Sequence, residues 1–161
     1  MDIREGGLSD PRVIELLRVH LHHARAETGP GSAHALDISG LQASGVRFWG
    51  LWEGETLLGV GALKDLGAGH GEVKSMHTAQ AARRRGIGGA MLRHLIDTAR
   101  ASGWTRLSLE TGSWAYFEPA HALYRLHGFS DCGPFGDYQP DPNSIFMTLD
   151  LRVTASDSRS A

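Results

Sequence analysis

The stretch Arg83-Arg84-Arg85-Gly86-Ile87-Gly88-Gly89-Ala90 decides how the rest of this chain is interpreted. It stands between Glu72 to Thr78, a segment with strand character, and residues 87 to 101, a segment with a strong helical pattern. Glycines let backbone N–H groups approach an anion, and a helix N-terminus favours negative charge. The stretch therefore predicts a pyrophosphate-binding loop. The alternative is a tight strand-to-helix turn whose arginines form a solvated rim.

Two common nucleotide-binding motifs do not fit this loop. A dinucleotide fingerprint needs a third glycine where this chain has Met91, counting from Gly86. A phosphate-binding P-loop needs a Gly-Lys pair, and the sequence contains none. The pattern therefore disfavours nicotinamide cofactors, ATP and GTP as ligands.

The segments around the loop predict alternating strands and helices. Residues 87 to 101 place apolar side chains three and four positions apart, which is typical of an amphipathic helix. Two apolar runs separated by Glu53-Gly54-Glu55 indicate a hairpin. The remaining predicted elements are helices at 12–26, 36–42 and 119–127, a loop at 28–33, hairpin strands at 46–52 and 56–62, and strands at 72–78, 104–110 and 144–151. This order predicts a mixed α/β sheet with helices on its faces.

Length and composition restrict the class of protein. With 161 residues, we expect one domain over residues 1–153 and a disordered tail over 154–161. The net charge of −2 disfavours broad nucleic-acid binding. The single cysteine, Cys132, excludes an intrachain disulfide and favours the cytoplasm. A signal peptide and a membrane-spanning stretch of about 18 apolar residues are both missing from the sequence, so we expect no membrane partner.

Two motifs together resemble the GNAT acetyltransferase superfamily. Arg83, Gly86 and Gly88 fill its signature [QR]-x-x-G-x-[GA], and residues 120–129 resemble its second motif, A-x-x-L-Y-x-x-x-G-F. A Phe-Gly-Asp-Tyr segment at 135–138 resembles a group of small bacterial members. The resemblance covers roughly residues 46 to 151. It implies a mixed, mostly antiparallel sheet of six or seven strands, splayed between the fourth and fifth, with helices on both faces and acetyl-CoA in the opening.

The resemblance also implies which residues bind acetyl-CoA. The backbone N–H groups of Arg84 to Gly89 would contact the pyrophosphate, and the backbones of Met76 and Thr78 would pair with pantetheine. The full set of implied cosubstrate-binding residues is Met76, Thr78, Arg83, Arg84, Arg85, Gly86, Ile87, Gly88 and Gly89.

Three residues are implied to take part in catalysis. The Met76 N–H would polarise the thioester carbonyl. Tyr124 matches the family tyrosine that protonates the departing CoA thiolate. Glu72 matches a glutamate that acts as a general base in some relatives. By the period-two rule, Glu72 shares a strand face with Lys74 and Met76, so an ion pair between Glu72 and Lys74 is an equal alternative.

The acceptor side of the site departs from the family pattern. Many members carry an asparagine where this chain has Phe117. Several other residues are either acceptor-site residues or ordinary loop and core residues: Asp137, Tyr138, Asn143 and Ser144 in the Pro/Gly-rich loop, and Trp49, Trp114 and Phe117 as an aromatic wall. We expect no metal site, because His20 and His23 lie on one helical face without a third ligand at a defined spacing.

These observations predict an acetyl-CoA-dependent N-acetyltransferase. It would acetylate an amine of a small molecule or peptide by direct attack in a ternary complex. A catalytically silent module that binds or senses acyl-CoA is the alternative, kept open by Phe117. A nucleotide-binding domain unrelated to acetyl transfer is a third. The sequence does not identify the acceptor, and a homodimer is a reasonable expectation for a small enzyme.

Overall fold

The computed structural model describes residues 1–27 and 38–152. The predicted loop at 28–33 and the predicted tail at 154–161 lie outside these residues. The described strands form one seven-stranded sheet in the order β1-β2-β3-β4-β5-β7-β6. The strands are β1 Asp2–Glu5, β2 Val46–Glu53, β3 Thr56–Gly67, β4 His70–Thr78, β5 Arg106–Gly112, β6 Ser130–Cys132 and β7 Ser144–Asp150. Only the pairing of β4 with β5 is parallel within this sheet, so the mixed, mostly antiparallel prediction is confirmed.

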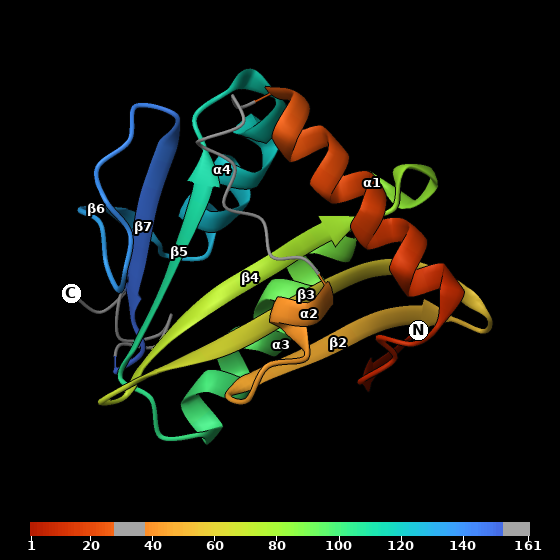
Figure 1. Cartoon of the computed structure of the whole chain (residues 1–161). Helices are drawn as coiled ribbons and strands as arrows, with labels where there is room; N and C mark the ends of the chain where they lie inside the picture. Colours follow the sequence, from red (N-terminus) through yellow and green to blue (C-terminus); the bar gives the residue numbers. More distant parts are fainter. Residues whose placement is uncertain (28–37, 153–161) are drawn as a thin grey trace.

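Helices cover both faces of the sheet (Figure 1). They are α1 Pro11–Glu27, α2 Ile38–Leu41, α3 Ile87–Ala101 and α4 Glu118–Leu126, with the 3-10 turns η1 Gln80–Ala82 and η2 Ala115–Phe117. The helices α1 and α2 lie on one face, and α3 lies on the other. Alternation along β3 supplies both cores, since Leu63 packs with α3 whereas Val60 and Ala62 pack with α1 and α2.

The two central strands separate halfway along their length. Their parallel register runs from His70 opposite Arg106 to Val73 opposite Leu109 and then ends. Yet β4 continues to Thr78 and β5 to Gly112. The C-terminal halves of β4 and β5 therefore diverge, as Figure 1 shows, and the predicted splay is confirmed.

A bulge at Ser75 changes the side of the sheet to which β4 presents its side chains. Ala62 pairs with Lys74 and Val60 with His77, so β4 contains one extra residue. Ser75 absorbs it in a left-handed conformation, with φ of 54°. Met76 consequently packs against the α3 core, opposite the face that carries Glu72 and Lys74. The prediction that these three residues share one face is therefore wrong for Met76, because strict alternation fails at a bulge.

The predicted boundaries are wrong at the end of β3, which runs to Gly67 rather than to residue 62, and at both ends of β5. Strand β5 begins at Arg106 rather than at Trp104, because the Trp104 ring covers Gly71 instead of pairing in the sheet. A Cβ atom on Gly71 would lie 2.1 Å from that ring. The short edge strands β1 and β6 were not predicted, since three or four residues carry little periodic signal.

Candidate active site

The loop that precedes α3 presents free backbone N–H groups. Gly86 caps the helix in a left-handed conformation with φ of 77°, and a Cβ atom there would meet nothing within 4 Å. The first helical hydrogen bond runs from Ala90 N–H to Gly86 C=O over 3.0 Å. The N–H groups of residues 87–89 therefore point out of the helix end without a partner from within the helix. This is the geometry that favours an anion at a helix N-terminus.

The second glycine of the loop brings three elements together. A Cβ atom on Gly88 would lie 3.1 Å from Leu123 Cδ2 on α4 and 3.7 Å from Thr78 Oγ1 at the end of β4. The loop, the end of β4 and α4 therefore meet at Gly88. Neighbouring Ile87 is only 2 % exposed and packs into the α3 core, which fixes the loop to the sheet.

The three arginines of the loop are exposed. Arg85 forms an ion pair of 3.0 Å with Glu53 at the tip of the β2–β3 hairpin. No other arginine of this trio makes a recorded ion pair among the described residues. The loop therefore offers both backbone N–H groups and positive side chains to an anion.

The edge of β4 that faces the opening has backbone groups free for a ligand. Ala79 donates its N–H to Leu58 C=O on β3 over 2.9 Å. Because backbone groups alternate between the two edges of a strand, the N–H groups of Met76 and Thr78 point to the opposite edge. That edge has lost its β5 partner beyond Val73. The backbone of Met76 and Thr78 therefore lies along the part of β4 that no strand of the described sheet covers.

Tyr124 lies in α4 and is 6 % exposed. Its ring centroid lies 5.8 Å from that of Phe129. Burial raises the pKa of the Tyr124 phenol well above its usual value, and the negative charge of Glu110 raises it further. Within the described parts of the chain, no group forms a recorded hydrogen bond with its hydroxyl. The hydroxyl is therefore a protonated donor that is available to a ligand.

Glu72 belongs to a buried polar cluster on the face of the sheet opposite the α3 core. Its Oε2 atom accepts hydrogen bonds from Tyr138 Oη at 2.6 Å and from Lys74 Nζ at 3.2 Å. Lys74 Nζ also donates to Tyr138 Oη at 2.8 Å. The Glu72 and Lys74 side chains are only 3 % and 10 % exposed. The predicted ion pair with Lys74 is thus present, and Glu72 Oε1 has no recorded partner among the described residues.

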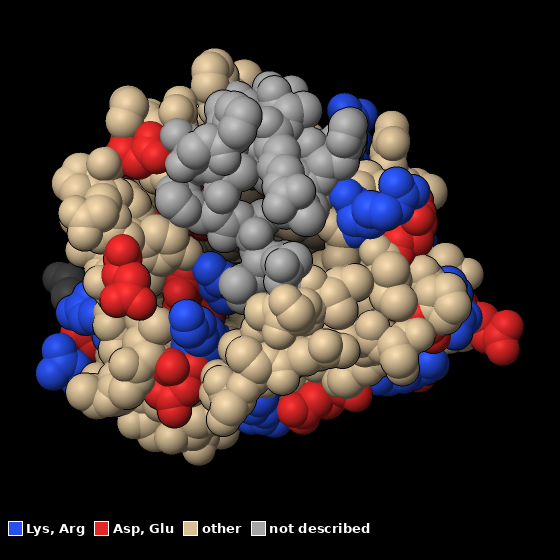
Figure 2. All heavy atoms as spheres, in the orientation of Figure 1, with Lys and Arg blue, Asp and Glu red and all other residues tan. Residues whose placement is uncertain are grey.

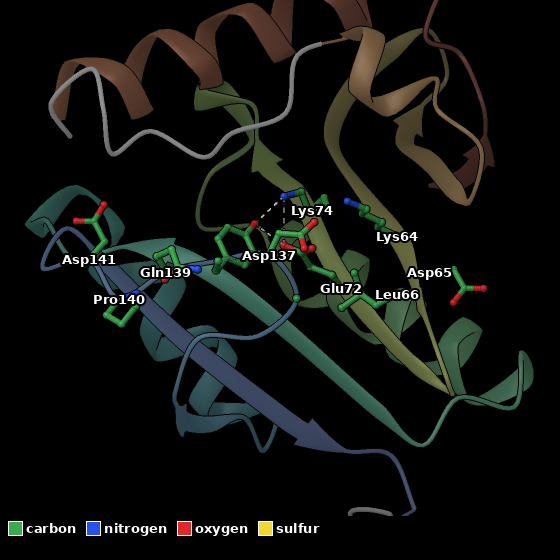
Figure 3. A pocket seen from close by; sticks show the side chains of 11 residues that line it. Lys64, Asp65, Leu66, Glu72, Lys74, Asp137, Gln139, Pro140 and Asp141 are labelled. Carbon is green, nitrogen blue, oxygen red and sulfur yellow. Dashed lines mark hydrogen bonds and ion pairs between the residues drawn. The ribbon is translucent and has the colours of Figure 1, made fainter.

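A pocket of about 620 Å³ lies beside this cluster (Figure 3). Its walls come from β3, β4 and the loop that precedes β7; the lining residues are Lys64, Asp65, Leu66, Glu72, Lys74, Gly136, Asp137, Tyr138, Gln139, Pro140 and Asp141. Positive and negative side chains stand side by side on this face of the molecule, as Figure 2 shows. Asp137 and Tyr138, two of the candidate acceptor-site residues, both line this pocket.

Other candidates lie elsewhere. Trp49 is 3 % exposed in the α3 core against His94, so it is not part of an aromatic wall. The Phe117 ring covers Gly112, where a Cβ atom would lie 2.2 Å from it. Ser144 donates to Glu110 Oε2 at 2.7 Å. Phe117 therefore fills space rather than replacing the amide of an asparagine.

The His20 ring lies 4.7 Å from the His77 ring, and the side chain of His23 is outside the described set. The described residues contain no group of three His, Cys, Asp or Glu side chains arranged to hold a metal ion. In residues 1–27 and 38–152, no helix has the length and apolar character that crossing a bilayer requires.

Sequence reasoning missed several pocket residues, among them Lys64. One signal was available, because Lys64 and Lys74 are the only lysines of the chain. The register places Lys64 directly opposite Glu72, and Lys74 lies on the same face. Both lysines line the pocket.

A glycine-rich loop at a helix N-terminus, beside a sheet that splays at its centre, is typical of acyl-CoA-binding enzymes. Residues 15–129 match the model of the acetyltransferase (GNAT) family. The chain therefore belongs to the GNAT family and is an acyltransferase. Its relatives include YsnE of Bacillus subtilis, an uncharacterised N-acetyltransferase that is 46 % identical over 151 residues, covering 94 % of this chain and 100 % of YsnE.

Solved structures agree with this assignment. A Klebsiella pneumoniae protein assigned as an acyl-CoA N-acyltransferase superposes with a TM-score of 0.74 at 26 % identity, covering 93 % of this chain and 97 % of that one. The PaiA N-acetyltransferase of Thermoplasma acidophilum, solved in complex with coenzyme A, has a TM-score of 0.68 at 18 % identity. The match covers 93 % of this chain and 99 % of the Thermoplasma chain. At this identity, the likeness concerns the fold alone.

Proposed function

We propose that this enzyme transfers an acetyl group from acetyl-CoA to an amine of a small molecule or peptide, by direct attack in a ternary complex. One observation carries the proposal. The gap between β4 and β5 is bordered by the free edge of β4 and by the Gly86–Gly88 loop, which meets the end of β4 and α4, the helix that carries Tyr124, at Gly88. The coenzyme A complex of the Thermoplasma structure supports the choice of donor.

The residues around the opening fit coenzyme A. Gly86 has open space on its outer side, and the helix end behind it carries unpaired N–H groups. We assign the pyrophosphate to the backbone of Arg84 to Gly89, with the side chains of Arg83, Arg84 and Arg85 nearby. We assign the pantetheine amides to the free backbone groups of Met76 and Thr78, which would extend the sheet at its open edge.

Acetyl-CoA supplies a thioester whose carbonyl carbon an amine can attack. In our proposal, the Met76 N–H donates a hydrogen bond to the carbonyl oxygen, where negative charge develops. Only the backbone of Met76 is needed, so its side chain is free to pack in the α3 core. In this proposal, the bulge at Ser75 lets the Met76 side chain pack in the core while the Met76 N–H faces the opening.

Glu72 is our candidate for the group that receives the proton of the acceptor ammonium, directly or through water. A protonated amine has no lone pair with which to attack, so it must first lose a proton. Glu72 Oε2 is held by Tyr138 and Lys74, which leaves Oε1 to accept the proton. The ion pair therefore orients the carboxylate without occupying both of its oxygens.

Tyr124 is our candidate for the acid that protonates the departing CoA thiolate. The phenol stays protonated because its burial raises its pKa. When the C–S bond breaks, the O–H group of Tyr124 can give its proton to sulfur and regain one from solvent. No covalent enzyme intermediate is needed.

The first test is a calorimetric titration with acetyl-CoA, with ATP and NAD as comparison ligands, followed by a thiol assay of CoA release with a panel of amines. We expect selective binding of acetyl-CoA and CoA release that depends on an amine. Well-folded protein that fails to bind acetyl-CoA would refute the proposed function. Binding without transfer to any amine would favour an acyl-CoA-binding module.

A further inference from the structure

We propose that the acceptor is a small amine that also carries a carboxylate, as amino acids do, and that Lys64 binds this carboxylate. The inference rests on the proposed acetyl transfer and names the class of acceptor. It concerns the pocket between β3, β4 and the loop of residues 136–141.

The charge of Lys64 has no counterpart in the described structure. Lys64 stands directly opposite Glu72 in the register of β3 and β4, where opposite charges usually pair. Glu72 instead binds Lys74 and Tyr138 through its Oε2 atom. No carboxylate among residues 1–27 and 38–152 forms a recorded ion pair with Lys64. In Figure 3, the Lys64 ammonium extends toward the same space as that of Lys74.

The other acids of the pocket do not neutralise this lysine. Asp65 accepts the backbone N–H of Gly67 at 2.8 Å, and its carboxylate is turned away from the cavity in Figure 3. Asp141 accepts the backbone N–H of Asn143 at 2.8 Å. Asp137 is exposed and forms no recorded ion pair with Lys64 among the described residues. The pocket thus has a buried carboxylate on β4 and an uncompensated ammonium on β3.

This separation of charge suits a zwitterion. The amine of the acceptor would lie toward Glu72 and the opening beyond it, and the carboxylate would lie toward Lys64. The volume of about 620 Å³ falls within the usual range for small-molecule sites. Glu72 offsets the charge of Lys74, and the remaining ammonium, that of Lys64, favours a group with one negative charge over a doubly charged phosphate.

The test uses matched pairs of acceptors and measures kcat/KM by CoA release. The pairs are L-phenylalanine with phenethylamine, and L-methionine with 3-(methylthio)propylamine; each second member lacks only the carboxylate. We expect at least about a tenfold preference for the carboxylate-bearing member, which corresponds to 1.4 kcal/mol. The preference should fall toward one in Lys64→Met and in Lys64→Gln, and Lys64→Arg should restore part of it.

Controls separate this inference from the proposed function. Arg18→Met removes an exposed cation of α1 that pairs with Glu15, and it should keep the wild-type preference. Equal use of both members of each pair, or an unchanged preference in both Lys64 variants, overturns the inference while acetyl transfer stands. A preference for the phosphonate analogue of phenylalanine over phenylalanine itself also overturns the carboxylate assignment.

A binding measurement covers the case in which none of these amines is acetylated. L-phenylalanine is titrated into the protein saturated with CoA, and the titration is repeated with Lys64→Met. We expect binding by the wild type that weakens about tenfold in the variant. Equal affinities, or no binding by the wild type, overturn the inference, whereas a failure of acetyl-CoA itself to bind is a failure of the proposed function.

Discussion

Tyr138 donates a hydrogen bond of 2.6 Å to Glu72, although 66 residues separate them in the sequence. Burial and the neighbouring Glu72 charge raise the pKa of the Tyr138 phenol, so Tyr138 remains a donor. The bond ties the loop before β7 to β4. This hydrogen bond therefore links the wall of the pocket to the Glu72 carboxylate, which Lys74 also holds.

Glu72→Gln is expected to destabilise the protein by about 3 kcal/mol, because it leaves Lys74 charged and buried without its partner. The double variant Glu72→Gln/Lys74→Met should recover a large part of this loss, since the uncompensated charge is gone. Urea denaturation of the two single variants and the double variant measures the coupling. Strictly additive losses would show that the pair is not coupled.

Tyr124→Phe is expected to lower kcat by about a hundredfold, the order associated with a general acid, with little change in the affinity for acetyl-CoA. The wild-type rate should not fall near pH 10, where an ordinary tyrosine ionises, because burial raises the pKa of Tyr124 above that value. Stopped-time CoA release and calorimetry provide the two readouts. Unchanged turnover in the variant would remove Tyr124 from the mechanism.

Gly88→Val is expected to weaken acetyl-CoA binding by about tenfold or more. A side chain at this position meets Leu123 at 3.1 Å and forces the loop away from α4, which displaces the N–H groups assigned to the pyrophosphate. Gly133→Ala is the matched control, because a Cβ atom there meets nothing within 4 Å and the backbone has no positive φ. Calorimetric titration with acetyl-CoA compares the two, and equal affinities would place the pyrophosphate elsewhere.

Acidification below about pH 6.5 is expected to destabilise the fold through His70 and His94. Burial lowers the pKa of both imidazoles, helped by Arg106 beside His70 and by Arg47 near His94. The unfolded chain then binds more protons than the folded chain, so stability is complete above about 6.5 and is lost as the pH falls through the lower folded-state pKa.

Urea denaturation at a series of pH values measures this loss, which amounts to at most about 1.4 kcal/mol per pH unit for each histidine. The window lies above the range in which ordinary carboxylates titrate. His94→Gln should reduce the slope. A stability that rises as the pH falls below 6.5 would contradict the expectation.

Local pattern was enough to predict most of the fold. The apolar spacing of residues 87–101 indicated α3, and the hairpin around Gly54 indicated β2 and β3. Two motifs separated by about thirty residues indicated the family before any contact was known. These features are local in sequence, since they depend on helical and strand periodicity and on glycines at fixed positions.

The sequence by itself therefore determined the family, the order of the helices and of every strand except β1 and β6, and the glycine loop before α3. Only the tertiary structure decided which residues meet at the site. The Ser75 bulge moved Met76 to the face opposite Glu72, and the loop before β7 brought Tyr138 onto β4. The pairing of β3 with β4 placed Lys64 in the pocket. Such contacts depend on register and on chain folding over long separations, which periodicity along the chain does not encode.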